Sequence, residues 1–145
     1  MFLDFFNKRK IPKKIPPEME KIAKSFRKIK SKEKRIRKIY DFLTSRYKMG
    51  RIKTYMRIFD LFQPIDKIWS RRSFIHCMNL NYLFTILLVK SGFDEDDINV
   101  KWTLVFYLSP HQYLNIKTGK NKSINVDAWG KSYGIKFGDY ARGFH

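Results

Sequence analysis

Apolar residues recur every three or four positions through the first third of the chain, which is the spacing of one face of a helix. The first such stripe consists of Ile15, Met19, Ile22, Phe26 and Ile29. Pro17 lies where this helix can begin, since its fixed φ angle suits a first helical turn. A second helix is expected over 32–47, and Gly50 is expected to end it. A short apolar segment follows over 55–62 and stops before Pro64.

Residues 75–90 are apolar on almost every side, a pattern typical of a helix buried at the centre of a domain. Ser73 is expected to cap the start of this helix, and Gly92 is expected to end it. Beyond the acidic loop 94–97 the apolar period changes from about 3.6 to two. The alternation over 100–108 predicts a strand.

Two further strands are predicted over 111–117 and 123–129, joined by a turn around Gly119. Helices therefore come first, and an antiparallel meander follows. This order predicts an α+β fold, with N-terminal helices and a central buried helix packed on an antiparallel sheet. The 145 residues suit a single domain over 18–145, preceded by a basic N-terminal lead over 1–17.

The formal net charge of +18 is unevenly distributed along the chain. Residues 8–53 hold 19 basic and 4 acidic side chains. Such a block favours an anionic partner: nucleic acid, anionic lipid or an acidic protein. The alternative is compositional, because lysine is abundant throughout the chain and fills exposed helix faces by default. The sequence contains no nucleic-acid-binding motif that decides between the two.

Several classes of protein are not expected from this sequence. No stretch of about 18 uncharged apolar residues occurs, so we expect no membrane-spanning helix. The first ten residues place apolar residues before basic ones, the reverse of a secretory signal. The single cysteine and three histidines leave no conventional zinc site. The acidic run 94–97 does not match a calcium-binding loop, so it is interpreted as a solvated loop, and no metal or cofactor is expected.

Cys77 is the only cysteine, which excludes an intramolecular disulfide and favours a reducing, cytoplasmic setting. It lies near the start of the buried helix, where free N–H groups and partial positive charge favour the thiolate. The same N–H groups can help to hold an oxyanion. The alternative is an inert core residue, because a free cysteine is usually buried and unreactive.

His111 opens the second predicted strand, and Asp127 lies near the end of the third. If the hairpin is symmetric about Gly119, Lys117 faces Asn121 and His111 faces Asp127. Directly opposed residues share one face of a sheet, with Cβ atoms about 4.5–5.5 Å apart, so the carboxylate can orient the imidazole. Taken singly, His111 is equally interpreted as a surface strand residue and Asp127 as a turn residue.

The order of these three residues resembles that of transglutaminase-like domains, the papain-related cysteine acyl-transfer fold. The segment HCMNLNYLFTILLVKSGF is similar to the family's cysteine followed by an apolar helix. HQYLN resembles its His-x-aromatic strand, and INVDAW resembles its Val-Asp strand end. KEKRIRKIYDFLTSRYKMG resembles the helix that precedes the cysteine. The resemblance spans about residues 18–130 and implies a catalytic triad of Cys77, His111 and Asp127.

The sequence also departs from the family pattern. His76 precedes the cysteine where the family often has Gly, which either crowds the helix start or offers a second imidazole near the thiol. The aromatic residue two positions after His111 is Tyr113, where the family more often has Trp. The second oxyanion donor is not identified, although Trp69 and Gln63 are upstream candidates.

The resemblance implies a cysteine-nucleophile acyl-transfer enzyme that forms a thioester on Cys77. His111 is expected to move the proton, and Asp127 is expected to hold His111. A peptidase or amidase acting on a peptide or protein substrate is the first expectation, and a crosslinking transglutaminase is the second. The alternative is a non-enzymatic adaptor with the same fold that binds nucleic acid or another polyanion through its basic helices.

Overall fold

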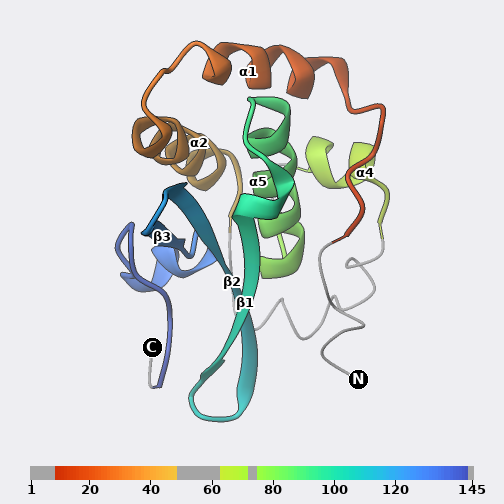
Figure 1. The fold of residues 1–145 in the computed structure, drawn as a ribbon. Helices are drawn as coiled ribbons and strands as arrows, with labels where there is room; N and C mark the ends of the chain where they lie inside the picture. Colours follow the sequence, from red (N-terminus) through yellow and green to blue (C-terminus); the bar gives the residue numbers. More distant parts are fainter. Residues whose placement is uncertain (1–8, 49–62, 72–74, 144–145) are drawn as a thin grey trace.

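The computed structural model describes residues 9–48, 63–71 and 75–143 of the chain. These residues combine helices with one three-stranded antiparallel sheet, which confirms the predicted α+β class (Figure 1). The α-helices are α1 (Pro17–Arg27), α2 (Lys32–Arg46), α4 (Ile65–Ser70) and α5 (Cys77–Lys90). The strands are β1 (Ile98–Val105), β2 (Ser109–Gly119) and β3 (Lys122–Val126), and the short 3-10 helices are η3 (Glu95–Asp97) and η4 (Trp129–Tyr133).

Helices α1 and α2 both pack against α5, with α1 across its upper end and α2 beside it, and together they form the α1–α2 layer (Figure 1). Pro17 lies in the first turn of α1, as predicted, and the Ser31 side chain caps α2 by accepting the Lys34 N–H. Helix α2 ends at Arg46 because Tyr47 is extended, so the prediction that Gly50 ends it is wrong. Gly50 itself and the predicted segment 55–62 lie outside the described residues.

Helix α5 is the centre of the core and packs on β2 as well as on α1 and α2. Its start differs from the prediction, because the capping side chain is that of His76, whose Nδ1 accepts the Met78 N–H. Ser73 lies outside the described residues. Gly92 ends the helix as predicted: its φ of +109° suits a residue without a Cβ.

The sheet has the order β1-β2-β3. The first predicted strand is displaced: β1 begins at Ile98 and ends at Val105, because Phe106 and Tyr107 take φ angles of +53° and +58° and turn the chain. The third predicted strand is too long, since β3 ends at Val126 and the chain enters η4. The β1–β2 hairpin projects away from the helices (Figure 1).

The register of the β2–β3 pair also differs from the prediction. Lys117 pairs with Ser123, two residues further along than Asn121. The reason is local, since the ladder is irregular between Lys117 and Gly119 and the turn takes up the extra residues. A shift of one residue would turn a strand over, but a shift of two leaves the same side chains on the same face.

Residues 9–16 contain no helix or strand, yet they are attached to the core. Ile11 and Ile15 pack against it, and the Tyr82 hydroxyl donates to the carbonyl of Lys10 at 3.1 Å. The Arg9 guanidinium lies 4.1 Å from the centre of the Tyr82 ring. The second half of the basic lead is therefore part of the folded unit.

Candidate active site

Three side chains from separate elements meet beside the start of α5. Cys77 is the first residue of α5, His111 lies on β2, and Asp127 follows the end of β3. His111 Nε2 lies 2.7 Å from Asp127 Oδ2, and the Cys77 sulfur is hydrogen-bonded to His111. The exposed fractions of the three residues are 5%, 3% and 2%. The structure therefore brings together all three residues named from the sequence.

The Asp127 carboxylate is held from three directions. Its Oδ1 accepts the Gly130 N–H at 2.9 Å, and its Oδ2 accepts the Ala141 N–H at 2.9 Å as well as the contact from His111. An ionised carboxylate can only accept, so the His111 proton lies on Nε2. Nδ1 is then the ring nitrogen left for the Cys77 sulfur, which is the orientation that a base needs.

The contact between His111 and Asp127 does not arise from the direct pairing predicted. In the observed register Leu114 pairs with Val126, so Asp127 lies just past the end of the paired strand. His111 and Asp127 are thus diagonal neighbours on one face, a separation of about 7–8 Å that long side chains bridge. The prediction of an opposed pair is wrong, but the two-residue shift preserves the shared face.

Burial and hydrogen bonding act in opposite directions on the Cys77 thiol. Burial alone raises the pKa of Cys77, but hydrogen bonds from His111 and His76 outweigh it and lower the pKa well below its usual range, to about 6. Burial likewise lowers the pKa of His111, but the bonds to Asp127 and Cys77 raise it from 6.5 to about 10. The two shifts favour a thiolate–imidazolium pair at neutral pH.

Aromatic rings enclose the imidazole and the neighbouring strand. The Trp129 ring lies 5.1 Å from that of His111 at an angle of 44°, and Tyr113 stacks on Tyr140 at 4.1 Å. Gly130 has a separate role, because a Cβ there would lie 2.8 Å from Asp127 Oδ2. Sequence reasoning missed the Gly130 and Ala141 N–H donors, since a backbone donor leaves no signature in the side-chain pattern.

The two upstream candidates for an oxyanion donor have other partners. Trp69 donates its Nε1–H to Glu18 Oε2 at 3.0 Å, which ties α4 to α1 and engages the indole N–H. The Gln63 amide oxygen accepts from Arg71 at 3.2 Å. The donors at the site itself are the N–H groups of the first turn of α5, beside Cys77.

The acidic run 94–97 forms η3, in which Asp94 accepts the Asp96 N–H at 3.0 Å and so caps the turn. Among the residues that the structure describes, no cluster of three or more His, Cys, Asp or Glu side chains is arranged to hold a metal ion. In the same part of the chain, no helix combines the length and apolar character needed to cross a membrane.

Comparison of the chain with protein-family models, with curated proteins and with solved structures found no match. The site is therefore interpreted from its own geometry. A buried thiolate, a base bonded to it and a carboxylate that orients the base together suit nucleophilic attack on a carbonyl carbon.

Proposed function

We propose that the protein is a cysteine-nucleophile acyl-transfer enzyme with the triad Cys77, His111 and Asp127. The observation that carries the proposal is the continuous chain of contacts from the sulfur through the imidazole to the carboxylate. Its position supports the proposal further, because Cys77 is the first residue of a helix. A helix N-terminus stabilises both a thiolate and an oxyanion formed beside it.

The reaction proceeds in two steps, acylation of Cys77 and hydrolysis of the thioester. The Cys77 thiolate attacks the substrate carbonyl carbon, an S–C bond forms, and the carbonyl oxygen becomes an oxyanion near the first N–H groups of α5. The oxyanion collapses and the C–N bond breaks, while His111 gives its proton to the leaving amine. Water then attacks the thioester and gives a proton to His111, and the S–C bond breaks to release the acid and the thiolate. An amine in place of water gives transfer instead of hydrolysis.

A peptidase or amidase is the first assignment, with a peptide or protein substrate, and a crosslinking transglutaminase is the second. We assign the domain to a transglutaminase-like core because of the order of its elements. A helix headed by the cysteine is followed by a strand bearing the histidine and a strand end bearing the aspartate. The single free cysteine fits a reducing, cytoplasmic setting.

The direct test is to trap the acyl intermediate on the full-length chain. The protein is incubated with a set of peptide amides and quenched in acid, and intact mass spectrometry then measures an added acyl group. The expected result is a single adduct on Cys77 that hydroxylamine removes. The adduct should be absent from Cys77→Ala and strongly reduced in His111→Ala. An adduct that forms equally well in His111→Ala contradicts the triad.

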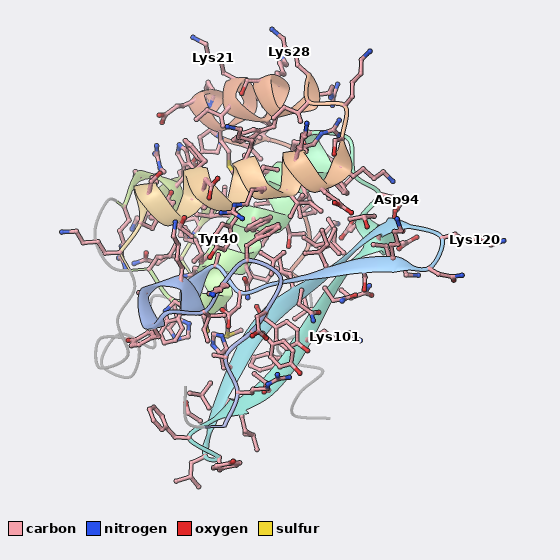
Figure 2. The ribbon with its side chains drawn as sticks, turned by 90° about the vertical axis from the view of Figure 1, so that its left-hand side faces the viewer. Lys21, Lys28, Tyr40, Asp94, Lys101 and Lys120 are labelled. Atoms are coloured by element: carbon pink, nitrogen blue, oxygen red, sulfur yellow. The ribbon has the colours of Figure 1, made fainter. Side chains whose placement is uncertain are left out.

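A second function is favoured by the α1–α2 layer. Lys21 and Lys28 point outward from α1 (Figure 2), and Lys24 and Lys38 are also exposed. Helices that bury Phe26 and present cations on the outer side suit binding of a polyanion. This surface can recruit a partner whether or not the triad is active, so the two functions are tested separately.

A further inference from the structure

His76 is a buried histidine in direct contact with the candidate nucleophile. Its Nδ1 lies 3.7 Å from the Cys77 sulfur, and its side chain is 9% exposed. The same Nδ1 accepts the Met78 N–H at 3.5 Å, so one nitrogen meets both the sulfur and the first turn of α5. The Cys77 sulfur therefore has two imidazole partners, one from its own chain neighbour and one from β2.

We propose that His76 is a second imidazole partner of the Cys77 sulfur, which orients the sulfur and stabilises the thiolate while His111 serves as the base. The inference rests on the proposed function and deepens it. It gives Cys77 two stabilising partners, of which only His111 is also held by a carboxylate.

The two contacts of His76 Nδ1 require different protonation states of that nitrogen. A ring nitrogen that accepts an N–H presents a lone pair, and a lone pair 3.7 Å from a thiolate is repelled by it. The contact is favourable when the sulfur carries its proton, or when Nδ1 carries a proton and donates it to the thiolate. The Met78 N–H and the sulfur thus compete for one nitrogen, and ionisation of Cys77 favours the bond to sulfur.

Burial makes this second partner important. The sulfur has lost most of its contact with water, and an anion in that position needs hydrogen-bond donors to replace the water. Within the part of the chain that the structure describes, the side chains that lower the pKa of Cys77 are the imidazoles of His111 and His76. The guanidinium and ammonium groups of α1 and α2 do not share this task.

A purely structural role is the alternative, since His76 also caps α5. Two substitutions separate the roles. His76→Ala removes both the cap and the imidazole, whereas His76→Asn restores a good capping residue and removes only the imidazole. Ser31→Ala is the matched control, because it deletes the cap of α2 far from the sulfur. All variants are made in the full-length chain, in which Cys77 is the only thiol.

The measurement is the rate of iodoacetamide alkylation of Cys77 across pH, with thermal unfolding of the same samples. His76→Asn should unfold near the wild-type temperature, yet near pH 6 it should alkylate about three- to tenfold more slowly, since one pKa unit is a factor of ten in thiolate. His76→Ala should combine this slower alkylation with a lower unfolding temperature. Ser31→Ala should lower the unfolding temperature alone.

The outcomes distinguish this inference from the proposed function. A wild-type alkylation profile in His76→Asn overturns the inference and leaves His76 as a helix cap. If the wild-type protein itself titrates as an ordinary thiol and His111→Ala changes nothing, the proposed function fails. A third outcome is a wild-type alkylation profile with a lowered thiol pKa that changes in His111→Ala but not in His76→Asn. That result supports the triad and overturns only the role proposed for His76.

Discussion

The two ends of α5 hold opposite charges: arginine cations contact its C-terminal end, and the Cys77 thiolate lies at its N-terminal end. At its C-terminal end, Arg27 donates to the Lys90 carbonyl at 2.9 Å and Arg35 donates to the Ser91 carbonyl at 2.8 Å. At its N-terminal end, the Cys77 sulfur has two buried imidazole partners, His76 and His111. The helix dipole favours both arrangements, since cations suit the C-terminus and anions suit the N-terminus.

The difference shows what converts a helix end into a reactive site. The arginines satisfy carbonyl oxygens that otherwise lack partners, and Arg27 remains exposed, so its charge is solvated. The thiolate is buried, so it depends on donors that can also move protons. Burial and the identity of the partner distinguish the two ends.

Removal of Asp127 should damage the site most. Asp127→Ala leaves the His111 ring and the Gly130 and Ala141 N–H groups without their acceptor in a buried place. Loss of one partner from such a buried pair costs about 3–5 kcal/mol. Urea unfolding should show this loss, and a loss below about 1 kcal/mol contradicts the buried network.

His111→Ala should slow alkylation of Cys77 near pH 6 by about a hundredfold or more, because each unit of pKa is a factor of ten in thiolate. Wild-type alkylation should rise with pH through about 6. The same rate before and after the substitution shows that the imidazole does not stabilise the thiolate. Labelling that requires unfolding identifies Cys77 as a core residue.

Ionisation of the Cys77–His111 pair should leave the free energy of unfolding almost independent of pH near neutrality. The lowered pKa of Cys77 adds stability that is present above its unfolded value of about 8.5 and is lost as pH falls through about 6. The raised pKa of His111 adds stability that is present below about 6.5 and is lost as pH rises through about 10. Their slopes oppose and cancel between about pH 6.5 and 8.5, where folding only moves a proton from sulfur to nitrogen. The alkylation rate, and not the unfolding temperature, is therefore the informative measurement.

Gly130→Ala should disturb the site without changing any of its ionisable groups. The added Cβ would lie 2.8 Å from Asp127 Oδ2 and 2.9 Å from the Ile135 side chain. Overpacking of this kind costs about 1–3 kcal/mol. Gly119→Ala is the matched control, since the nearest atom to its Cβ is 3.8 Å away. Equal unfolding temperatures for the two variants count against the close packing of Asp127.

Arg35→Ala tests the opposite end of α5. It removes donors to the carbonyls of Ile29 and Ser91, and hydrogen bonds from a charged group contribute about 1–2 kcal/mol at a half-buried position. Thermal unfolding should detect the loss, while the pH profile of Cys77 alkylation should stay at the wild-type position. A shifted profile means that the two ends are coupled through the helix.

The smallest effects are expected on the outer surface of α1. If this layer binds a polyanion, log affinity for heparin or single-stranded DNA should fall linearly with log salt. Lys21→Gln and Lys28→Gln should each reduce that slope by about one if the lysine contacts a phosphate or sulfate group. Cys77 alkylation should not change. Affinity that is independent of salt rules out an electrostatic surface.

Much of the fold follows from local pattern. The stripes over α1 and α2 and the apolar run of α5 predicted these helices, because side chains that must be buried impose their period on the chain. The positions of Cys77, His111 and Asp127 in the order of elements also followed from sequence. The ends of the elements were less predictable, as the turn at Phe106 and the early end of α2 at Arg46 show.

The apolar pattern was enough to locate α1, α2, α5 and the three strands approximately, and to place one thiol near the start of a buried helix, but it gave no sign of α4. Only the tertiary structure decided the register that makes His111 and Asp127 diagonal neighbours, and the N–H donors from Gly130 and Ala141. It also decided that His76 caps α5 beside the sulfur. The physical reason is that a period specifies the face on which a side chain lies, whereas a contact depends on how separate elements pack in space.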